Sequence, residues 1–141
     1  MPKKKKILFL CTGNSIRSQM AEGLMEALGN DEWEVHSAGS MPSFVHPLAI
    51  QVMAEIGINI SHHNSKLVIQ FLNEDFDYVV TLCDFAAAIC PTIPGKGQRL
   101  HWPIDDPIGI IGLSEQKLAA FRKARDEIRV KIEEFLTSGS F

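Results

Sequence analysis

The sequence predicts an α/β fold: a single domain with a mostly parallel four-stranded sheet and helices on both faces. Short apolar runs alternate along the chain with helical segments that have one apolar face, and this order is typical of parallel sheets. The length of 141 residues corresponds to one domain. Because neither an internal repeat nor a linker interrupts the pattern, we expect one domain over residues 1–141.

The first half of the chain predicts two strands and a helix. Residues 7–10 form a continuous apolar run, which is typical of a strand buried on both faces. A turn over residues 12–15 follows. Residues 18–28 then place their apolar side chains on one helical face, and a Gly-Asn pair ends the helix. Residues 33–39 alternate in polarity as a second strand does.

The second half predicts two further helices and two further strands. Pro47 opens a helix that Gly57 ends. Residues 78–82 and 99–102 are the third and fourth strand candidates. The last helix begins near Ser114 and carries one apolar stripe opposite a face of alternating charge. Parallel sheets place ligand sites at the carboxyl ends of their strands, so we expect a site in the loops that follow them.

Composition excludes several classes of protein. The chain has 14 basic and 17 acidic residues, a net charge of −3. Four of the basic residues form the run at positions 3–6, so the rest of the chain is more strongly acidic, which argues against binding nucleic acid. No apolar run approaches the ~20 residues of a membrane span. The apolar stretch at 7–11 is too short for a signal peptide. We therefore expect a cytoplasmic protein with three reduced cysteines.

The loop after the first strand, residues 11–18 (here called the anion loop), reads Cys-Thr-Gly-Asn-Ser-Ile-Arg-Ser. A loop that enters a helix N-terminus directs backbone N–H groups and partial positive charge into one space, which suits a tetrahedral oxyanion. Arg17 can bind two oxygens of such an anion. Cys11 lies at the floor as a nucleophile whose thiolate these groups stabilise. The alternative is a buried cysteine and a surface arginine without function, but the strand-turn-helix context favours a site. The predicted oxyanion-binding residues are Thr12, Gly13, Asn14, Ser15, Ile16, Arg17 and Ser18.

An acidic pair, Asp105 and Asp106, follows the fourth strand and precedes Pro107. Chemistry at the central atom of an oxyanion requires a proton for the departing oxygen, and a carboxylic acid above the loop can supply it. Asp-Pro taken alone favours an ordinary turn. The nearby anion loop favours the catalytic interpretation.

Two more cysteines, Cys83 and Cys90, follow the third strand. Their spacing equals two helical turns, about 10.5 Å, whereas the Cα atoms of a disulfide lie within about 7 Å. If the segment is helical, a disulfide between them requires it to unwind. The pair is therefore either inert or a conformational switch.

Residues 11–23, Cys-Thr-Gly-Asn-Ser-Ile-Arg-Ser-Gln-Met-Ala-Glu-Gly, resemble the thioredoxin-coupled arsenate reductases, whose phosphate loop and fold are shared by the low-molecular-weight protein tyrosine phosphatases. The resemblance continues through residues 37–39, 46–47, 80–83, 90–91 and 102–107 and covers nearly the whole chain. It implies that Asp106, directly before proline, is the acid. It also implies that Cys11, Cys83 and Cys90 form a thiol-disulfide relay that reduces arsenate to arsenite and that thioredoxin regenerates, with no bound cofactor. Phosphate and sulfate are expected to bind as analogues of arsenate.

Two other functions remain open at this point. A phosphatase acting through a phosphoryl group on Cys11 would need no second thiol. Phosphatases of this family carry aromatic residues after Asp-Pro, whereas Ile108, Gly109 and Ile110 stand here, which disfavours a tyrosine phosphatase. The third hypothesis is a non-catalytic binder or redox sensor that uses the three thiols, for example for trivalent arsenic.

The sequence departs from its relatives at a cation site. In some relatives Asn14, Glu22 and Ser37 bind potassium together with an acidic residue, and Lys66 stands at the matching position here. Its ammonium group would repel a cation and could replace it beside Glu22. We expect potassium activation to be weak or absent. The histidines lack the spacing of metal ligands, so no metal site is predicted. Ile16 replaces a cysteine found in many relatives, and the three relay cysteines are retained.

Overall fold

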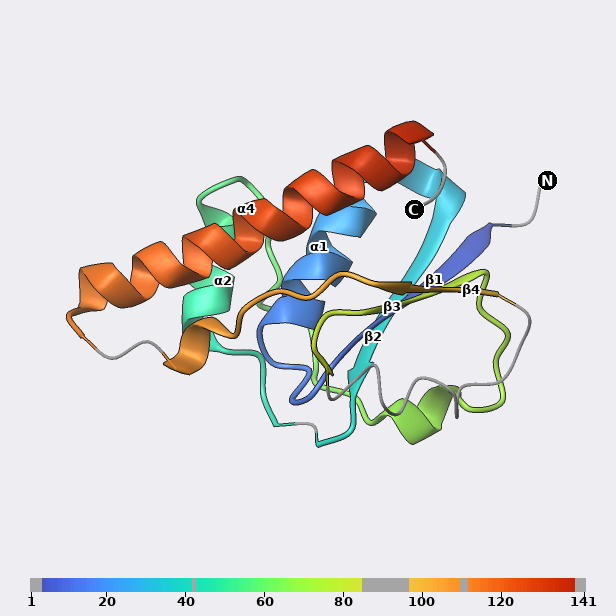
Figure 1. Ribbon diagram of the computed structural model, residues 1–141, viewed down its shortest axis with the longest axis horizontal. Coiled ribbons are helices and arrows are strands. Elements are labelled where there is room, and N and C mark those ends of the chain that lie inside the picture. The colour runs from blue at the N-terminus through green and yellow to red at the C-terminus, as the bar shows by residue number, and fades with distance from the viewer. Residues whose placement is uncertain (1–3, 42, 85–96, 110–111, 139–141) are drawn as a thin grey trace.

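The computed structural model describes residues 4–41, 43–84, 97–109 and 112–138 (Figure 1). The elements in chain order, with η for a 3-10 helix, are β1 (Lys5–Cys11), α1 (Arg17–Leu28), η1 (Asn30–Glu32), β2 (Trp33–Gly39), α2 (Pro47–Ala54), η2 (Val68–Phe71), β3 (Tyr78–Thr81), β4 (Gln98–His101), η4 (Pro107–Gly109) and α4 (Ser114–Ser138). All four predicted strands and all three predicted helices are present. Their ends differ from the predicted ends by at most a few residues, as is usual where helices fray.

The sheet has the strand order β2-β1-β3-β4, and every neighbouring pair is parallel. This confirms the predicted four-stranded parallel sheet. The chain moves outward from β1 to β2 and then returns to the other side of β1, so the order reverses between β1 and β3. Ligands of open α/β sheets bind at such a switch point, outside the carboxyl ends of the strands. Cys11, the last residue of β1, and Cys83, two residues beyond β3, both lie there.

Successive residues of β1 enter two separate cores, because side chains alternate between the faces of a strand. Ile7, Phe9 and Cys11 pack into the core that α1, α2 and α4 cover. Leu8 and Leu10 pack on the opposite face against residues of η2 and its neighbours. Figure 1 shows α1, α2 and α4 above the sheet and η2 below it. Helices thus cover both faces, as predicted, and β1 is buried on each side.

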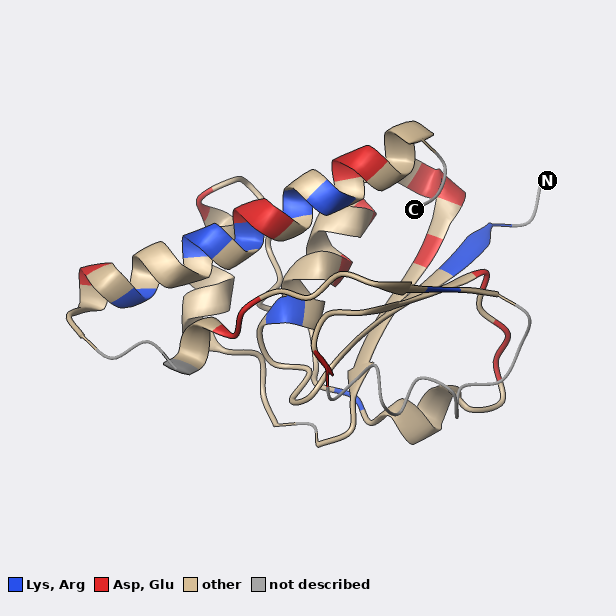
Figure 2. Cartoon of the chain, in the orientation of Figure 1, with Lys and Arg blue, Asp and Glu red and all other residues tan. Residues whose placement is uncertain are grey.

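Helix α4 shows the predicted charge pattern. Basic and acidic residues alternate along its outer face (Figure 2), while its apolar stripe packs on the sheet core. Arg125 is the exception, because its guanidinium is buried and bonds to the Val52 carbonyl and to Glu55, both at 2.9 Å. These bonds tie α4 to α2. Among the helices of the described residues, none carries an apolar stretch that would span a bilayer.

Candidate active site

The anion loop connects β1 to α1 at the switch point of the sheet. Helix α1 begins at Arg17, and no side chain caps its first N–H groups. The N–H groups of residues 41, 43 and 46 donate to the carbonyls of residues 12, 13 and 15, at 3.0, 3.2 and 3.0 Å. In a trans peptide the carbonyl and the next N–H point in opposite directions, so the N–H groups of residues 13, 14 and 16 point away from the 41–46 segment. Amides gathered at an uncapped helix N-terminus form a binding site for an anion.

The carboxyl end of β2 packs directly against this loop at Gly39. A Cβ atom at Gly39 would lie 2.5 Å from the Thr12 carbonyl oxygen and 2.8 Å from that of Cys11. Real side chains do not tolerate such distances. Glycine is therefore required here, because the backbone of β2 and the anion loop approach so closely.

Asn14 holds the shape of the anion loop. Its φ of 47° lies in the left-handed region, and its side chain is fully buried. The Lys66 main-chain N–H donates to its Oδ1 at 2.7 Å. Because that N–H can only donate, the orientation of the amide is fixed, and Nδ2 donates to Ser18 Oγ at 2.7 Å and to Ser37 Oγ at 3.0 Å. Asparagine tolerates this backbone conformation better than most residues.

Cys11 lies at the floor of the loop and is 3% exposed. Its Sγ is 2.8 Å from Ser18 Oγ. Ser18 Oγ already accepts the Asn14 amide, so its own proton is available to donate to the sulfur. A hydrogen bond donated to sulfur favours the thiolate. Asn14 thus fixes the direction of the contact between Ser18 and Cys11.

Arg17 links the anion loop to the loop after β4. Its Nη1 donates to the Ile104 carbonyl at 2.9 Å, and its Nη2 lies 3.4 Å from Asp106 Oδ2. The guanidinium is largely buried, whereas the Asp106 side chain is 45% exposed. The other carboxylate oxygen of Asp106 accepts the Ile108 N–H at 3.0 Å. The geometry thus brings the predicted acid and the predicted anion-binding arginine together.

His46 connects this region to α2. Its Nδ1 accepts the Leu48 N–H at 3.1 Å and caps the helix. Burial lowers the pKa of His46 below its usual range, and the charge of Asp106 opposes that shift. A ring that accepts through Nδ1 must lack a proton there, so the capping geometry agrees with the neutral form.

The second predicted cysteine lies beside the anion loop. Cys83 is half-buried, two residues beyond β3, and its Sγ is 3.5 Å from Thr12 Oγ1. This contact exists because β1 and β3 are neighbours and their carboxyl ends meet at one edge. Cys90 lies outside the described residues, so its place in the relay stays a prediction.

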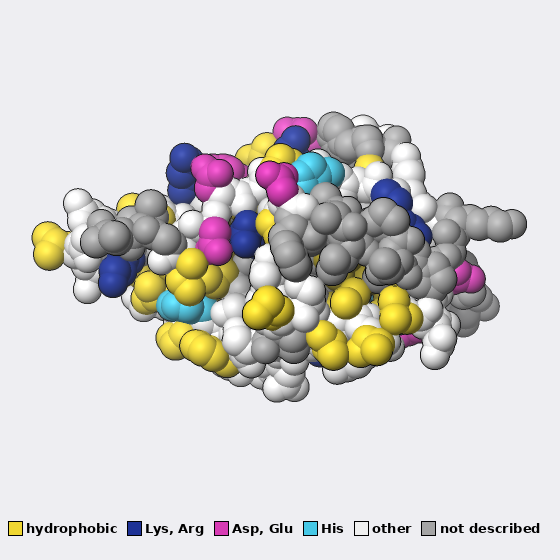
Figure 3. Space-filling view, turned by 60° about the horizontal axis from the view of Figure 1, so that its bottom comes forward, with side chains coloured by type: hydrophobic (Ala, Val, Ile, Leu, Met, Phe, Trp, Pro, Cys, Tyr) yellow, Lys and Arg dark blue, Asp and Glu magenta, His cyan; other side chains and the backbone are white. Residues whose placement is uncertain are grey.

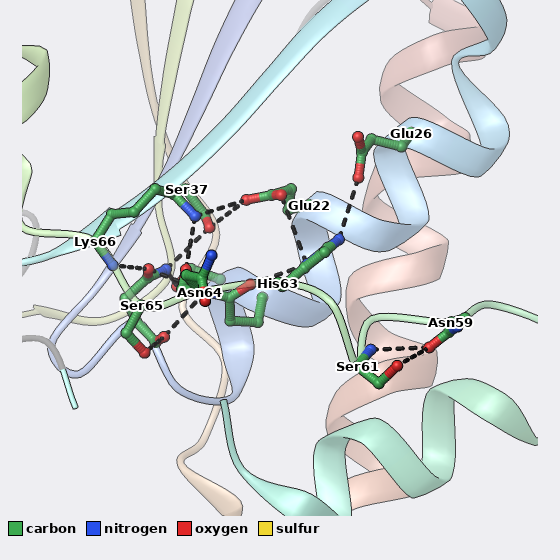
Figure 4. Close-up of polar contacts among 12 residues, drawn as sticks. Glu22, Glu26, Ser37, Asn59, Ser61, His63, Asn64, Ser65 and Lys66 are labelled. Atoms are coloured by element: carbon green, nitrogen blue, oxygen red, sulfur yellow. Dashed lines mark hydrogen bonds and ion pairs between the residues drawn. The ribbon is translucent and has the colours of Figure 1, made fainter. Parts of the chain in front are cut away.

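Figure 4 shows the polar cluster behind the loop, where Glu22, Ser37 and Lys66 converge. Ser37 Oγ donates to Glu22 Oε1, and Lys66 Nζ lies 3.6 Å from that same oxygen. Lys66 Nζ also donates to the Asn64 carbonyl at 2.8 Å. His63 Nδ1 lies 3.6 Å from the other oxygen of Glu22. Burial lowers the pKa of His63, and the Glu22 charge opposes this shift.

Two groups of side chains among the described residues bring potential metal-binding atoms within 4.8 Å of one another: Glu22, Glu26 and His63, and Glu34, His36 and Glu74. A lysine lies at each group. Lys66 is 3.6 Å from Glu22, and Lys6 is 2.8 Å from Glu74. An ammonium group in that position supplies the positive charge that a metal would bring.

The sequence analysis did not single out two polar side chains that support the anion loop. Gln19 is fully buried, and its Nε2 lies within 3.1 Å of the carbonyl and Oδ1 of Asn14 and of the Asn64 carbonyl. Ser65 Oγ donates to the Asn14 carbonyl at 2.7 Å. No pattern in the sequence marks either contact, because Gln19 is one of several polar residues in α1 and its partner Asn64, like Ser65, lies in a loop distant along the chain.

The rim of the site is apolar, in contrast to its floor. Met41 and Phe44, on the loop before α2, and Ile108, in η4, are 67%, 62% and 58% exposed. Apolar side chains also gather at several places on the face shown in Figure 3.

Comparison with known proteins agrees with this geometry. Residues 6–138 match the family described as low molecular weight phosphotyrosine protein phosphatase. The chain is 49% identical over 136 residues to an arsenate reductase of Halalkalibacterium halodurans, covering 96% of this chain and 98% of the relative. It is 45% identical over 135 residues to the arsenate reductase of Bacillus subtilis, covering 96% and 97%.

Solved structures give the same result. An arsenate reductase in the phosphate-binding state superposes with a TM-score of 0.81 at 36% identity, covering 95% of this chain and 98% of that one. A thioredoxin-dependent arsenate reductase of Corynebacterium glutamicum superposes with a TM-score of 0.73 at 31% identity, covering 96% of this chain and 61% of that one. The chain therefore belongs to the low molecular weight phosphotyrosine protein phosphatase family, and it is similar over nearly its whole length to the arsenate reductases of that family.

Proposed function

We propose that this protein reduces arsenate to arsenite through a relay of Cys11, Cys83 and Cys90 and that thioredoxin regenerates it. The observation that carries the proposal is the contact of Cys83 Sγ with Thr12 Oγ1 at 3.5 Å. Because of this contact, the Cys83 thiol lies beside the anion loop, which begins with Cys11. A hydrolase has no use for that thiol, whereas a reductase requires it as an electron source.

In the first step the Cys11 thiolate attacks arsenic, and one arsenate oxygen leaves as water. Arg17 and the loop amides hold the other oxygens, and Ser18 stabilises the thiolate before attack. Asp106, which lies 3.4 Å from the anion-binding Arg17 and so within reach of the bound oxyanion, donates a proton to the departing oxygen. The product is an arsenic(V) group bonded to the Cys11 sulfur.

In the second step the Cys83 thiolate attacks the Cys11 sulfur. A sulfur–sulfur bond forms, the sulfur–arsenic bond breaks, and its electron pair stays on arsenic. Arsenic is thereby reduced from the +5 to the +3 state and leaves as arsenite, while two thiols are oxidised to one disulfide. Cys90 then attacks Cys83, which frees the Cys11 thiolate and leaves a disulfide between Cys83 and Cys90.

The dithiol of thioredoxin reduces that last disulfide, so the net reaction is arsenate plus reduced thioredoxin to arsenite, oxidised thioredoxin and water. The solved C. glutamicum relative is thioredoxin-dependent, which supports the choice of donor. The reaction needs reduced thiols, which agrees with a cytoplasmic location. Phosphate and sulfate compete for the same loop, and potassium is not required because Lys66 lies beside Glu22.

The alternative function is hydrolysis of phosphate esters through a Cys11–phosphoryl intermediate. The nucleophile, the arginine and the acid would serve this reaction equally well, and the matched family carries the name of a phosphatase. Neither Cys83 nor Cys90 takes part in it. The two functions therefore differ in whether they require Cys83 and Cys90.

A coupled assay separates them. The reduced protein receives arsenate, thioredoxin, thioredoxin reductase and NADPH, and NADPH absorbance is followed. We expect steady oxidation in the parent, one turnover of arsenite release in Cys90→Ser, and none in Cys83→Ser. Hydrolysis of an aryl phosphate is measured in the same three proteins. A phosphatase without reductase activity would hydrolyse the ester equally in all three and leave NADPH unchanged.

A further inference from the structure

Asp84 and His101 meet beside the second cysteine. His101 is the last residue of β4 and pairs in register with Thr81, the last residue of β3. Its Nδ1 lies 2.7 Å from Thr81 Oγ1, and its Nε2 lies 3.1 Å from Asp84 Oδ1. One imidazole thus bridges a buried hydroxyl at the end of the sheet and a carboxylate one residue beyond Cys83.

The chain is fixed on both sides of Cys83. On one side, the Leu82 N–H donates to the Leu10 carbonyl at 2.9 Å, and the Leu82 carbonyl accepts the Ile104 N–H at 3.0 Å. On the other side, Asp84 is bound to His101. The Asp84 side chain is otherwise exposed to water, so this bond is the contact among the described residues that restrains it. Together the two attachments determine where the Cys83 side chain emerges over Thr12.

The bridge persists in either charge state of the imidazole. When the ring is neutral, Thr81 donates to Nδ1 and the Nε2–H group donates to Asp84. When the ring is protonated, the Nδ1–H group donates to Thr81 Oγ1, and the Thr81 proton turns to the Leu100 carbonyl at 3.4 Å. Each arrangement satisfies the three groups.

We propose that Asp84 and His101 are positioning residues that hold Cys83 in line with the Cys11 sulfur. This inference rests on the proposed function, because it assigns Cys83 the attack that releases arsenite. Attack of one sulfur on another needs close and aligned approach, so a small displacement of the attacking residue lowers the rate. Neither residue touches the oxyanion, and neither affects the first step.

The test uses the Cys90→Ser protein, in which a single turnover stops at the Cys11–Cys83 disulfide. Asp84→Ala and His101→Phe are added separately and are expected to slow arsenite release about three- to tenfold, because an exposed side-chain contact contributes modestly. His101→Gln keeps a donor near the Nε2 position and is expected to restore most of the rate. Asp75→Ala removes an exposed aspartate before β3, at the other end of the sheet, and is the matched control with an unchanged rate.

Two further measurements distinguish a displaced Cys83 from a disturbed anion loop. Alkylation of Cys11 by iodoacetamide, and its protection by phosphate, are expected to stay unchanged in all variants, since the anion loop is intact. Disulfide formation between Cys11 and Cys83 driven by diamide needs no arsenate, and it is expected to slow in Asp84→Ala and His101→Phe.

Equal rates of diamide-driven disulfide formation in the Cys90→Ser protein with and without Asp84→Ala or His101→Phe would overturn the positioning role. Slower Cys11 alkylation in the variants would also overturn it, since the damage would then reach the anion loop. If the Cys90→Ser protein formed the Cys11–Cys83 disulfide with diamide but released no arsenite from arsenate, that result would contradict the proposed function alone. Slower diamide coupling in the variants would still support the positioning of Cys83.

Discussion

The ammonium group of Lys66 lies 3.6 Å from the Glu22 carboxylate, behind the loop that holds Cys11. Glu22 is nearly buried and also accepts a hydrogen bond from Ser37. Ser37 in turn accepts the side-chain amide of Asn14, whose φ is in the left-handed region. The charge of Lys66 is thus connected by two hydrogen bonds to the backbone of the anion loop.

This arrangement predicts that activation by potassium is weak or absent. Turnover measured in sodium and in potassium buffers of equal ionic strength is expected to be similar, because the lysine occupies the cationic position. Lys66→Asp replaces the ammonium by a carboxylate next to Glu22, and we expect potassium to increase both its turnover and its melting temperature. Lys117→Asp makes the same charge change at an exposed site on α4 and serves as the control. A severalfold gain from potassium in the parent would contradict this prediction.

Asp106 is expected to act as the acid and Asp105 is not. Asp106→Asn keeps an oxygen that can accept the Ile108 N–H but cannot supply a proton, so we expect arsenate turnover to fall about 10²- to 10⁴-fold. Phosphate binding to the variant is expected to persist, as measured by protection of Cys11 from alkylation. Asp105→Asn removes the neighbouring exposed charge and is expected to stay within about twofold of the parent. A similar loss in both variants would show that charge in this loop matters rather than proton donation.

Asn14 is expected to stabilise the protein in two separable ways. Asn14→Ala loses the buried amide with its hydrogen bonds and places a β-carbon at a φ of 47°. We expect it to lower the free energy of unfolding by about 3 kcal/mol or more, measured by urea denaturation. Asn14→Gly loses the same bonds but accepts the backbone conformation, so it is expected to be about 1 kcal/mol more stable than Asn14→Ala. If Asn14→Ala had a higher free energy of unfolding than Asn14→Gly, the left-handed φ at position 14 would not destabilise a residue with a β-carbon.

Acidification is expected to destabilise the protein through His46. Burial lowers the pKa of His46 in the folded protein, so the unfolded chain binds a proton first as the pH falls below about 6.5. The stability that the neutral ring provides is complete above that pH and is lost as the pH falls through the lowered pKa. The protonated ring also loses its capping bond to the Leu48 N–H, worth about 1 kcal/mol.

His46→Asn keeps a capping acceptor that does not titrate. Its melting temperature is expected to fall less than that of the parent between pH 7.5 and pH 5.5, with the same substitution at exposed His62 as the control. Part of the pH dependence remains, because burial also lowers the pKa of His63. Identical pH profiles for the parent and His46→Asn would argue against the role of His46.

Local sequence was sufficient for the architecture and for the anion loop. The apolar run at 7–10 predicts a strand buried on both faces, and the structure packs alternate residues of β1 into two cores. The segment from Cys11 to Ser18 predicts a strand, a turn and a helix start, and the contacts of Ser18 with Cys11 and with Asn14 form inside this segment. Such features are predictable because they depend on neighbours along the chain.

Other features depend on which strands are neighbours in the sheet, and the order of the strands along the chain does not reveal this. The contact of Thr12 with Cys83 exists because β3 pairs with β1, and the bridge from Asp84 to His101 exists because β4 pairs with β3. Gln19 and Ser65 support Asn14 from positions that no pattern marks. The sequence by itself determined the chemistry available to this protein: a nucleophilic thiol, an arginine, an acid and two further thiols. Only the tertiary structure decided which of these groups meet, because a parallel sheet gathers the carboxyl ends of strands that are far apart in the chain.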